Sequence, residues 1–113
     1  LLWFSGADEV NLAHLAQGAT GVVSVVGHLA GARYAEMVAA VDAGDLVTAR
    51  RIHTALIPLV EAIMTTSQGA IMAKAALVEQ GIIAHATVRL PYVESPPAHL
   101  EKLRAALAGA DLS

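Results

Sequence analysis

The sequence predicts an α/β fold in which two strand–helix units precede a run of helices. Residues 18–28, GATGVVSVVGH, indicate a strand over Gly21–Val26 that is apolar on both faces except at Ser24. Strands of this kind belong to parallel sheets that helices cover. A second apolar run, residues 1–5, lies roughly a dozen residues upstream, which is the crossover length that joins parallel strands. From His28 onward the apolar residues recur at helical spacing.

The first strand–helix unit lies before the valine run. LLWFS, residues 1–5, has the length and apolar character of a strand. A helix follows to about Gln17, and the side-chain oxygen of Ser5 or Asp8 is expected to cap the free N–H groups of its first turn. Gly18 ends this helix. Its apolar residues are Val10, Leu12 and Leu15.

Two helices are predicted between residues 32 and 66. The first spans Ala32–Ala43, and Gly44 ends it, since glycine readily adopts the left-handed conformation that closes helices. Asp45 caps the second helix, which runs to about Thr66 with an apolar residue every three or four positions. Pro58 inside it predicts a kink, because proline lacks the N–H that an internal helical position donates.

The carboxyl-terminal part predicts two further helices separated by an irregular segment. The first spans Ala70–Gln80 and ends at Gly81. The segment Ile82–Glu94, centred on RLP, shows no regular period. Ser95 is expected to cap the last helix, with Pro96 at its first position, where the missing N–H would have no partner in any helix. The apolar face of this helix consists of Leu100, Leu103 and Leu107.

Composition excludes several classes of protein. Seven basic and ten acidic residues leave no basic surface for nucleic acid. The absence of cysteine removes disulfides and thiolate metal sites, and it fits a reducing compartment. The histidines show no HExxH motif and no i, i+4 pair, so we expect no metal site. They stand at positions 14, 28, 53, 85 and 99.

The chain is strongly apolar, with 56% hydrophobic residues and a mean hydropathy of +0.58. The uncharged run Val10–Ala32 is long enough for a membrane helix, but polar residues and glycines interrupt it, so we expect no membrane segment. Two parallel strands can neither bury both faces nor close a barrel. Together with the start at LLWF, this predicts that the chain is part of a larger protein that covers its apolar faces.

Two motifs carry a resemblance to a known family. The segment SGADEVNLAHLAQGATGVVSVVGH at 5–28, with AGDLVTARRIH at 43–53 and RLPYV at 89–93, resembles the dihydrodipicolinate synthase and N-acetylneuraminate lyase family of pyruvate-dependent class I aldolases. In that family the pattern after strand seven is Ser-Gly-Asp-Asp, here SGAD at 5–8. Strand eight carries Gly-Val-Ile-Ser-Val, here GVVSV at 21–25. The resemblance covers all 113 residues.

The resemblance implies a (β/α)8 TIM barrel of which this chain supplies the last two βα units. Residues 1–31 would be the end of the barrel, namely strands seven and eight with the helix between them. Residues 32–113 would be the last barrel helix and the carboxyl-terminal helical domain. Active sites of such barrels lie at the carboxyl ends of the strands, so Gly27-His28 would stand near the mouth.

The implied chemistry needs a lysine that forms a Schiff base with pyruvate and so yields an enamine nucleophile. In the family that lysine lies on strand six, upstream of Leu1, and the catalytic tyrosine and paired threonines lie upstream as well. Lys74 and Lys102 fall on predicted helices and are expected to be solvated, and neither Tyr34 nor Tyr92 matches the family's tyrosine. The chain alone is therefore expected to have no catalytic residue and to be inactive. No cofactor is implied.

Gly6 and Val23 are the residues expected to contribute to substrate binding. Gly6 matches the glycine whose backbone lies beside the bound substrate, where the missing side chain permits close approach. Val23 matches a strand-eight residue, usually Ile, that packs on the pyruvate-derived carbons; filling of the barrel is a compatible alternative. Ala7 replaces an acidic residue of the family pattern, and His28 stands where many relatives have Asn, and both changes bear on aldehyde binding.

Other polar positions allow alternatives. His28 is either a proton carrier, since histidine titrates near neutrality, or the donor of a structural hydrogen bond, which we favour because the sequence fixes no partner carboxylate. Asp8 is more typical of a helix cap than of a catalytic acid. Arg50-Arg51 indicates a solvated helix face or a contact between subunits.

The resemblance implies a cytoplasmic lyase that condenses pyruvate with aspartate semialdehyde to 4-hydroxy-tetrahydrodipicolinate in lysine and diaminopimelate biosynthesis. Members of the family are often tetramers assembled from dimers, so the implied partners are the N-terminal remainder of the barrel and further copies of the complete protein. Two alternatives stay open. One is another pyruvate aldolase of the family that acts on sugar acids or sialic acid, and the other is a non-enzymatic helical association module.

Overall fold

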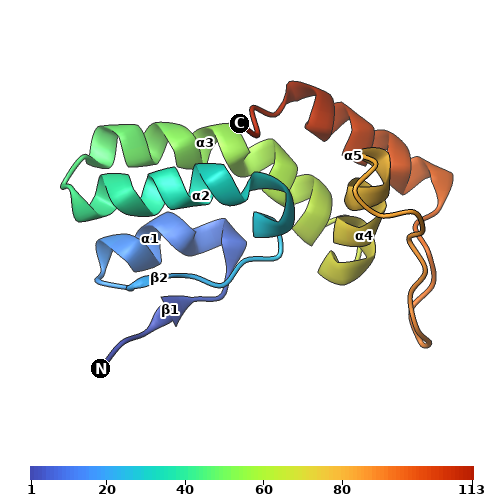
Figure 1. Ribbon diagram of the computed structural model, residues 1–113, viewed down its shortest axis with the longest axis horizontal. Coiled ribbons are helices and arrows are strands. Elements are labelled where there is room, and N and C mark those ends of the chain that lie inside the picture. Colours follow the sequence, from blue (N-terminus) through green and yellow to red (C-terminus); the bar gives the residue numbers. More distant parts are fainter.

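The computed structural model describes residues 1–113 and contains two short strands with the main helices on one side of them (Figure 1). The order of strand, helix, strand and then helices agrees with the predicted α/β arrangement. The elements are β1 (Phe4–Ser5), the 3-10 helix η1 (Asp8–Val10), α1 (Asn11–Ala16), β2 (Gly21–Val22), α2 (Gly27–Asp42), α3 (Leu46–Met64), α4 (Gly69–Glu79) and α5 (Pro97–Gly109).

The strands β1 and β2 are parallel neighbours, as the length of the crossover predicts. Phe4 pairs with Gly21, and Ser5 pairs with Val22. The ladder continues by one bond beyond the strands, because the backbone N–H of Val23 donates to the Ser5 carbonyl at 2.7 Å. Both strands therefore end side by side and point in the same direction.

The second strand is shorter than predicted. Regular pairing stops at Val22 instead of residue 26, and α2 begins at Gly27 instead of Ala32. The physical reason is the carboxylate of Asp8, which binds two backbone N–H groups of the valine run and so turns the chain into the first turn of a helix. The predicted boundary between residues 31 and 32 consequently lies inside α2, just after a break in the helix at Ala30 (φ −116°, ψ 29°).

Several helix ends follow their sequence signals. Asp45 caps α3 by accepting the backbone N–H of Thr48 at 3.0 Å. The helix α3 then continues through Pro58 as a single element. The glycines predicted to end helices have positive φ angles of 100°, 77° and 71°, at Gly18, Gly44 and Gly81 respectively.

The starts of α4 and α5 differ from the predicted positions. Gln68 caps α4 with its side-chain oxygen, which accepts a backbone N–H of the first turn at 2.8 Å. α5 begins at Pro97 and has Pro96 at its cap position, so the prediction of Ser95 as cap was wrong by one residue. The Ser95 hydroxyl instead donates to the sulfur of Met72 at 3.3 Å.

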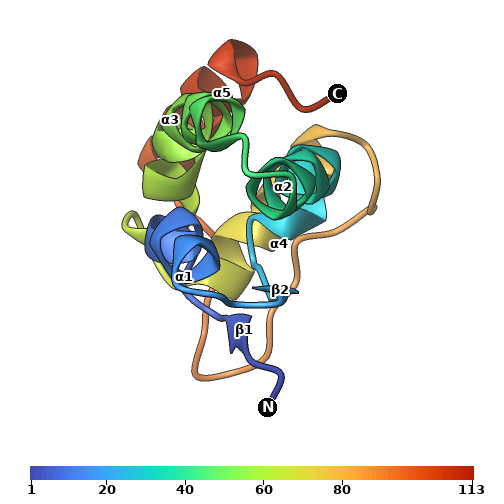
Figure 2. The ribbon, with the colours of Figure 1, turned by 90° about the vertical axis from the view of Figure 1, so that its left-hand side faces the viewer.

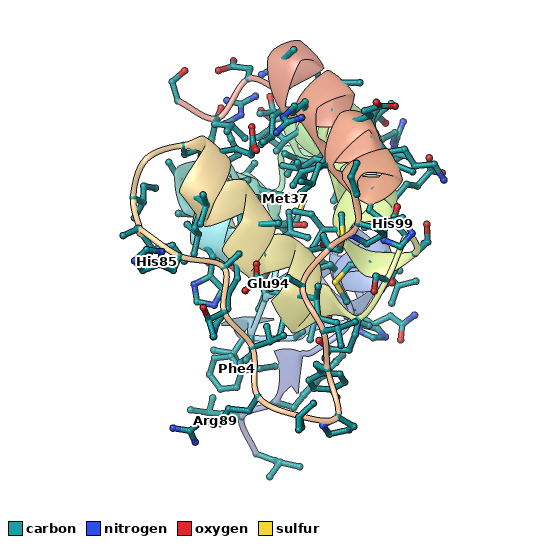
Figure 3. The ribbon with its side chains drawn as sticks, turned by 90° about the vertical axis from the view of Figure 1, so that its right-hand side faces the viewer. Phe4, Met37, His85, Arg89, Glu94 and His99 are labelled. Carbon is teal, nitrogen blue, oxygen red and sulfur yellow. The ribbon has the colours of Figure 1, made fainter.

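The segment between α4 and α5 forms an extended arm, and Figure 3 shows Arg89 toward its far end. This segment is irregular, as predicted. The Nζ of Lys74 on α4 donates to the carbonyl of Thr87 in the arm at 2.7 Å. α4 and α5 are joined by two hydrogen bonds of 2.8 Å from the Arg104 guanidinium to the Glu79 carboxylate.

The core lies between α2, α3 and the helices beside them, while the strands stand at its margin (Figure 2). Met37, Ile52 and Ile63 are fully buried, and Leu103 anchors α5. Large apolar side chains of the strand region remain exposed, namely Leu1, Leu2, Phe4 and Val23. No single helix is long and apolar enough to cross a membrane; α3 and α4, bent by 110° at their junction, meet that test only as a pair, on length and composition.

Candidate functional site

The two residues predicted to bind substrate lie where the strands end. Gly6 follows the last residue of β1, and Val23 follows the last residue of β2. The hydrogen bond from the Val23 N–H to the Ser5 carbonyl, 2.7 Å long, brings the two positions together. Val23 is 70% exposed. A Cβ at Gly6 would meet nothing within 4 Å, so both residues face open space in this chain.

Asp8 is buried next to this pair of strand ends. Only 3% of its surface is exposed. Its Oδ2 accepts the backbone N–H groups of Val25 and Val26, each at 3.0 Å. Two of the N–H groups that precede the first turn of α2 are thereby bound by a carboxylate, which also suits the positive end of the helix dipole.

Ser24 completes the cap of α2. Its hydroxyl donates to Oδ1 of Asp8 and accepts the backbone N–H of Gly27 at 2.7 Å. A Cβ at Gly27 would stand 3.1 Å from the Cβ of Ser24, so glycine permits this close approach. The sequence predicted that Asp8 caps the helix that follows it. In the structure Asp8 instead caps α2, across the strand pair and together with Ser24.

The same carboxylate is connected to β1. Asn11 donates its amide N–H to Oδ1 of Asp8 at 2.9 Å. The carbonyl of the Asn11 side chain accepts the Ser5 hydroxyl at 2.6 Å, and the Ser5 oxygen also lies 2.9 Å from Nδ1 of His14. We call Ser5, Asp8, Asn11 and Ser24 the Asp8 network; it links the carboxyl end of each strand to the same buried charge.

Tyr34 of α2 adds a buried hydroxyl beside this network. The residue is 3% exposed, and its hydroxyl lies close to the side chains of Asp8, Asn11 and Ser24 but forms no hydrogen bond of full geometry with any of them. Burial, followed by the negative charge of Asp8, raises the pKa of Tyr34, so the phenol stays protonated at neutral pH. A carboxylate has about four acceptor positions, and those of Asp8 are taken by its four bound donors.

The sequence predicted His28 just beyond the end of a strand. In the structure it lies in the first turn of α2. Its side chain is exposed and lines a groove of about 630 Å³ together with Val22, Ser24 and Tyr34. Its ring forms neither a salt bridge nor a hydrogen bond, so the structural hydrogen bond that the sequence favoured is not found. This geometry supplies no partner that would make His28 a proton carrier.

The lysines lie away from the strand ends. Lys74 is on α4, and its amine is bound to the carbonyl of Thr87. Lys102 is on α5 and is exposed. Arg50 and Arg51 are exposed on α3. No group of three or more His, Asp or Glu side chains is placed to hold a metal ion.

The family resemblance singled out Gly6 and Val23, but the sequence analysis did not predict the Asp8 network. Its bonds join residues up to 18 positions apart, so no local pattern contains them. The available signal was Ser24, because a single hydroxyl within a valine run needs a polar partner when it lies in the interior.

Comparisons with known proteins give a consistent result. A sequence profile described as the dihydrodipicolinate synthetase family matches residues 1–110. The 4-hydroxy-tetrahydrodipicolinate synthase of Kineococcus radiotolerans is 55% identical over 113 residues, which are 100% of this chain and 37% of that protein. The chain thus spans little more than a third of the length of this curated relative.

Solved structures agree with the sequence comparisons. The dihydrodipicolinate synthase of Thermotoga maritima superimposes with a TM-score of 0.90 at 34% identity, over 95% of this chain and 36% of that one. The chloride-inhibited enzyme of Acinetobacter baumannii, solved in complex with pyruvate, gives a TM-score of 0.91 at 28% identity, over 100% of this chain and 38% of that one.

Proposed function

Since the chain belongs to the dihydrodipicolinate synthetase family, we propose that it forms the last two βα units of a (β/α)8 barrel and the helical domain that follows them, in a 4-hydroxy-tetrahydrodipicolinate synthase. The observation that carries the proposal is the match over 100% of this chain to 37% of a synthase at 55% identity. The parallel strands and the exposed apolar residues around them support it, because a barrel needs further strands at both edges.

The complete protein would join pyruvate to aspartate semialdehyde. An upstream lysine would attack the pyruvate ketone and expel water, and the resulting Schiff base would lose a proton to give an enamine that attacks the aldehyde. The pyruvate complex of the Acinetobacter baumannii enzyme supports pyruvate as the first substrate. Neither Lys74 nor Lys102 lies at a strand end, so this chain would supply the wall of the site and not its nucleophile.

Gly6 and Val23 would form that wall at the mouth of the barrel. The open space at Gly6 would let the substrate lie against the backbone. The exposed side chain of Val23 would cover the pyruvate-derived carbons. Residues 1–31 would be strands seven and eight of the barrel with the helix between them, and residues 32–113 would be the last barrel helix and the helical domain. The N-terminal remainder of the barrel would be the first partner, and a dimer of dimers the complete assembly.

The test traps the Schiff base with borohydride and reads the intact mass of the polypeptide. Two samples are compared: the 113-residue chain, and a fusion that places it after the upstream part of the Kineococcus radiotolerans relative, in place of the matched segment. We expect a pyruvate adduct on the fusion and none on the chain alone. Lys74→Arg in the fusion is the matched control and should leave the adduct unchanged.

Each other outcome has a clear meaning. An adduct on the chain alone would show that one of its own lysines is the nucleophile. A folded fusion that traps no pyruvate would contradict the proposal and favour the helical association module. A fusion that traps pyruvate but consumes sugar-acid aldehydes in preference to aspartate semialdehyde would reassign the aldehyde.

A further inference from the structure

We propose that Asp8 is a positioning residue of the pyruvate site: its buried carboxylate sets the path of residues 23–27 and thereby holds the Val23 side chain in register with Gly6. This inference rests on the proposed function, because it assigns Asp8 a role in the site that the complete synthase would have. Asp8 itself would not touch the substrate.

The first step of the inference concerns the turn after β2. The last bond of the strand ladder is the one from the Val23 N–H to the Ser5 carbonyl, so the ladder does not fix residues 24–27. The N–H groups of Val25 and Val26 are both bound by Asp8. The N–H of Gly27 is bound by the Ser24 hydroxyl, which Asp8 orients through a further hydrogen bond. One carboxylate thus restrains three consecutive N–H groups of the turn, directly or through one hydroxyl.

The second step concerns the other strand end. Asp8 accepts the Asn11 amide, and Asn11 accepts the Ser5 hydroxyl. Ser5 directly precedes Gly6, and Ser24 directly follows Val23. The two residues that would contact pyruvate are therefore each adjacent to a side chain held by the Asp8 network. A displacement of the carboxylate would change the spacing between them.

The third step separates positioning from contact. Asp8 is 97% buried, because only 3% of its surface is exposed. Its four hydrogen bonds fill the acceptor positions of a carboxylate. A group in this state has neither the access nor the free lone pair that a substrate contact needs.

The substitution Asp8→Asn tests this inference in the active fusion protein described above. Asparagine keeps the size of the side chain but replaces one acceptor oxygen by an NH₂ donor, which would then face groups that are themselves donors. We expect the KM for pyruvate to rise by about tenfold, since small misplacements in a site have effects of this order or larger. We expect kcat at saturating pyruvate to stay within about twofold. Glu9→Gln, an exposed neighbour, is the control and should change neither constant.

A merely structural role gives a different result. Loss of folded protein would lower kcat in proportion to the inactive fraction and leave the KM for pyruvate unchanged, which would overturn the inference. If Asp8→Asn does not fold, Ser24→Ala, which removes one hydrogen bond to the carboxylate, should raise the KM in the same direction by a smaller factor. An unchanged KM in that folded variant would also overturn it.

Failure of the proposed function is distinguishable, because it shows in the unsubstituted fusion, which would then trap no pyruvate. In that event, amide hydrogen exchange of the 113-residue chain still decides whether Asp8 holds the turn. Asp8→Asn should then speed exchange at Val25 and Val26, and Glu9→Gln should not. Unchanged exchange at both amides would remove the structural basis of the inference.

Discussion

The carboxylate of Asp8 accepts the backbone N–H of Val26 at 3.0 Å, although the two residues stand 18 positions apart in the chain. This bond joins the segment after β1 to the start of α2, and it determines where β2 ends. A negative charge at the amino end of a helix is favourable, because the N–H groups there have no partners within the helix. The fold of this region therefore depends on one side chain, and the site proposed above would depend on the same side chain.

Asp8→Ala should lower the free energy of unfolding of the 113-residue chain by about 3 kcal/mol, because it leaves buried N–H groups unpaired, each at a cost of about 1–3 kcal/mol. Urea denaturation followed by circular dichroism measures this change. Glu9→Gln, at the exposed neighbouring position, should alter the same quantity by less than about 0.5 kcal/mol. Equal losses in the two variants would show that the network contributes little to stability.

Tyr34→Phe should raise the free energy of unfolding by about 1 kcal/mol. Burial desolvates the hydroxyl, and no hydrogen bond of full geometry to Asp8, Asn11 or Ser24 offsets that cost, so removal of the hydroxyl should be favourable and should leave the packing of the ring unchanged. Tyr92→Phe, at an exposed position of the arm, is the matched control and should have no measurable effect. A loss of stability in Tyr34→Phe would mean that the hydroxyl is bonded in solution.

The sequence predicted those features that depend on local signals. Gly44 as the end of one helix and Asp45 as the cap of the next placed the junction of α2 and α3 correctly. The sequence misplaced the start of α5 because Pro96 and Pro97 both fit an early helical position, and the structure uses the second. It also extended β2 to Val26, since a valine run favours a strand and the partner that ends it, Asp8, is distant in the chain.

The candidate site was predicted only in part. Gly6 and Val23 were named because they match substrate-binding positions of the family that the sequence resembles; the structure places them side by side at the ends of the two strands. The role of Asp8 was predicted as a cap, but of the wrong helix. A side chain that caps a helix across two strands has no spacing rule, so only the three-dimensional arrangement could assign it.

Asp45 should make the stability of the chain depend on acid pH. The hydrogen bond from the Thr48 N–H lowers the pKa of Asp45 in the folded state. A carboxyl group with a lowered pKa stabilises the fold above its unfolded pKa, near 3.9, and this contribution is lost as the pH falls through the folded value. The difference in stability between the unsubstituted chain and Asp45→Ala should therefore shrink as the pH falls from about 5 to about 2, a range that extends roughly 1–2 units to either side of the unfolded pKa.

Urea denaturation at several pH values measures this difference. Asp42→Ala is the control, because Asp42 is exposed at the end of α2, caps no helix and forms no salt bridge. A difference between the unsubstituted chain and Asp45→Ala that stays constant down to pH 2, roughly two units below the unfolded pKa, would contradict the assignment of Asp45 as an ionised cap.

Val23→Ala separates the part that Val23 plays in the isolated chain from its part in the complete barrel. Because the side chain is 70% exposed, the substitution should change the free energy of unfolding of the 113-residue chain by less than about 0.5 kcal/mol. Val26→Ala is the matched control, since Val26 is fully buried and the same truncation should cost about 2 kcal/mol there. In the fusion protein, Val23→Ala should raise the KM for pyruvate, because the truncated side chain no longer covers the substrate carbons. A fusion that loses stability and keeps its KM would instead show that Val23 fills the barrel and does not contact the substrate.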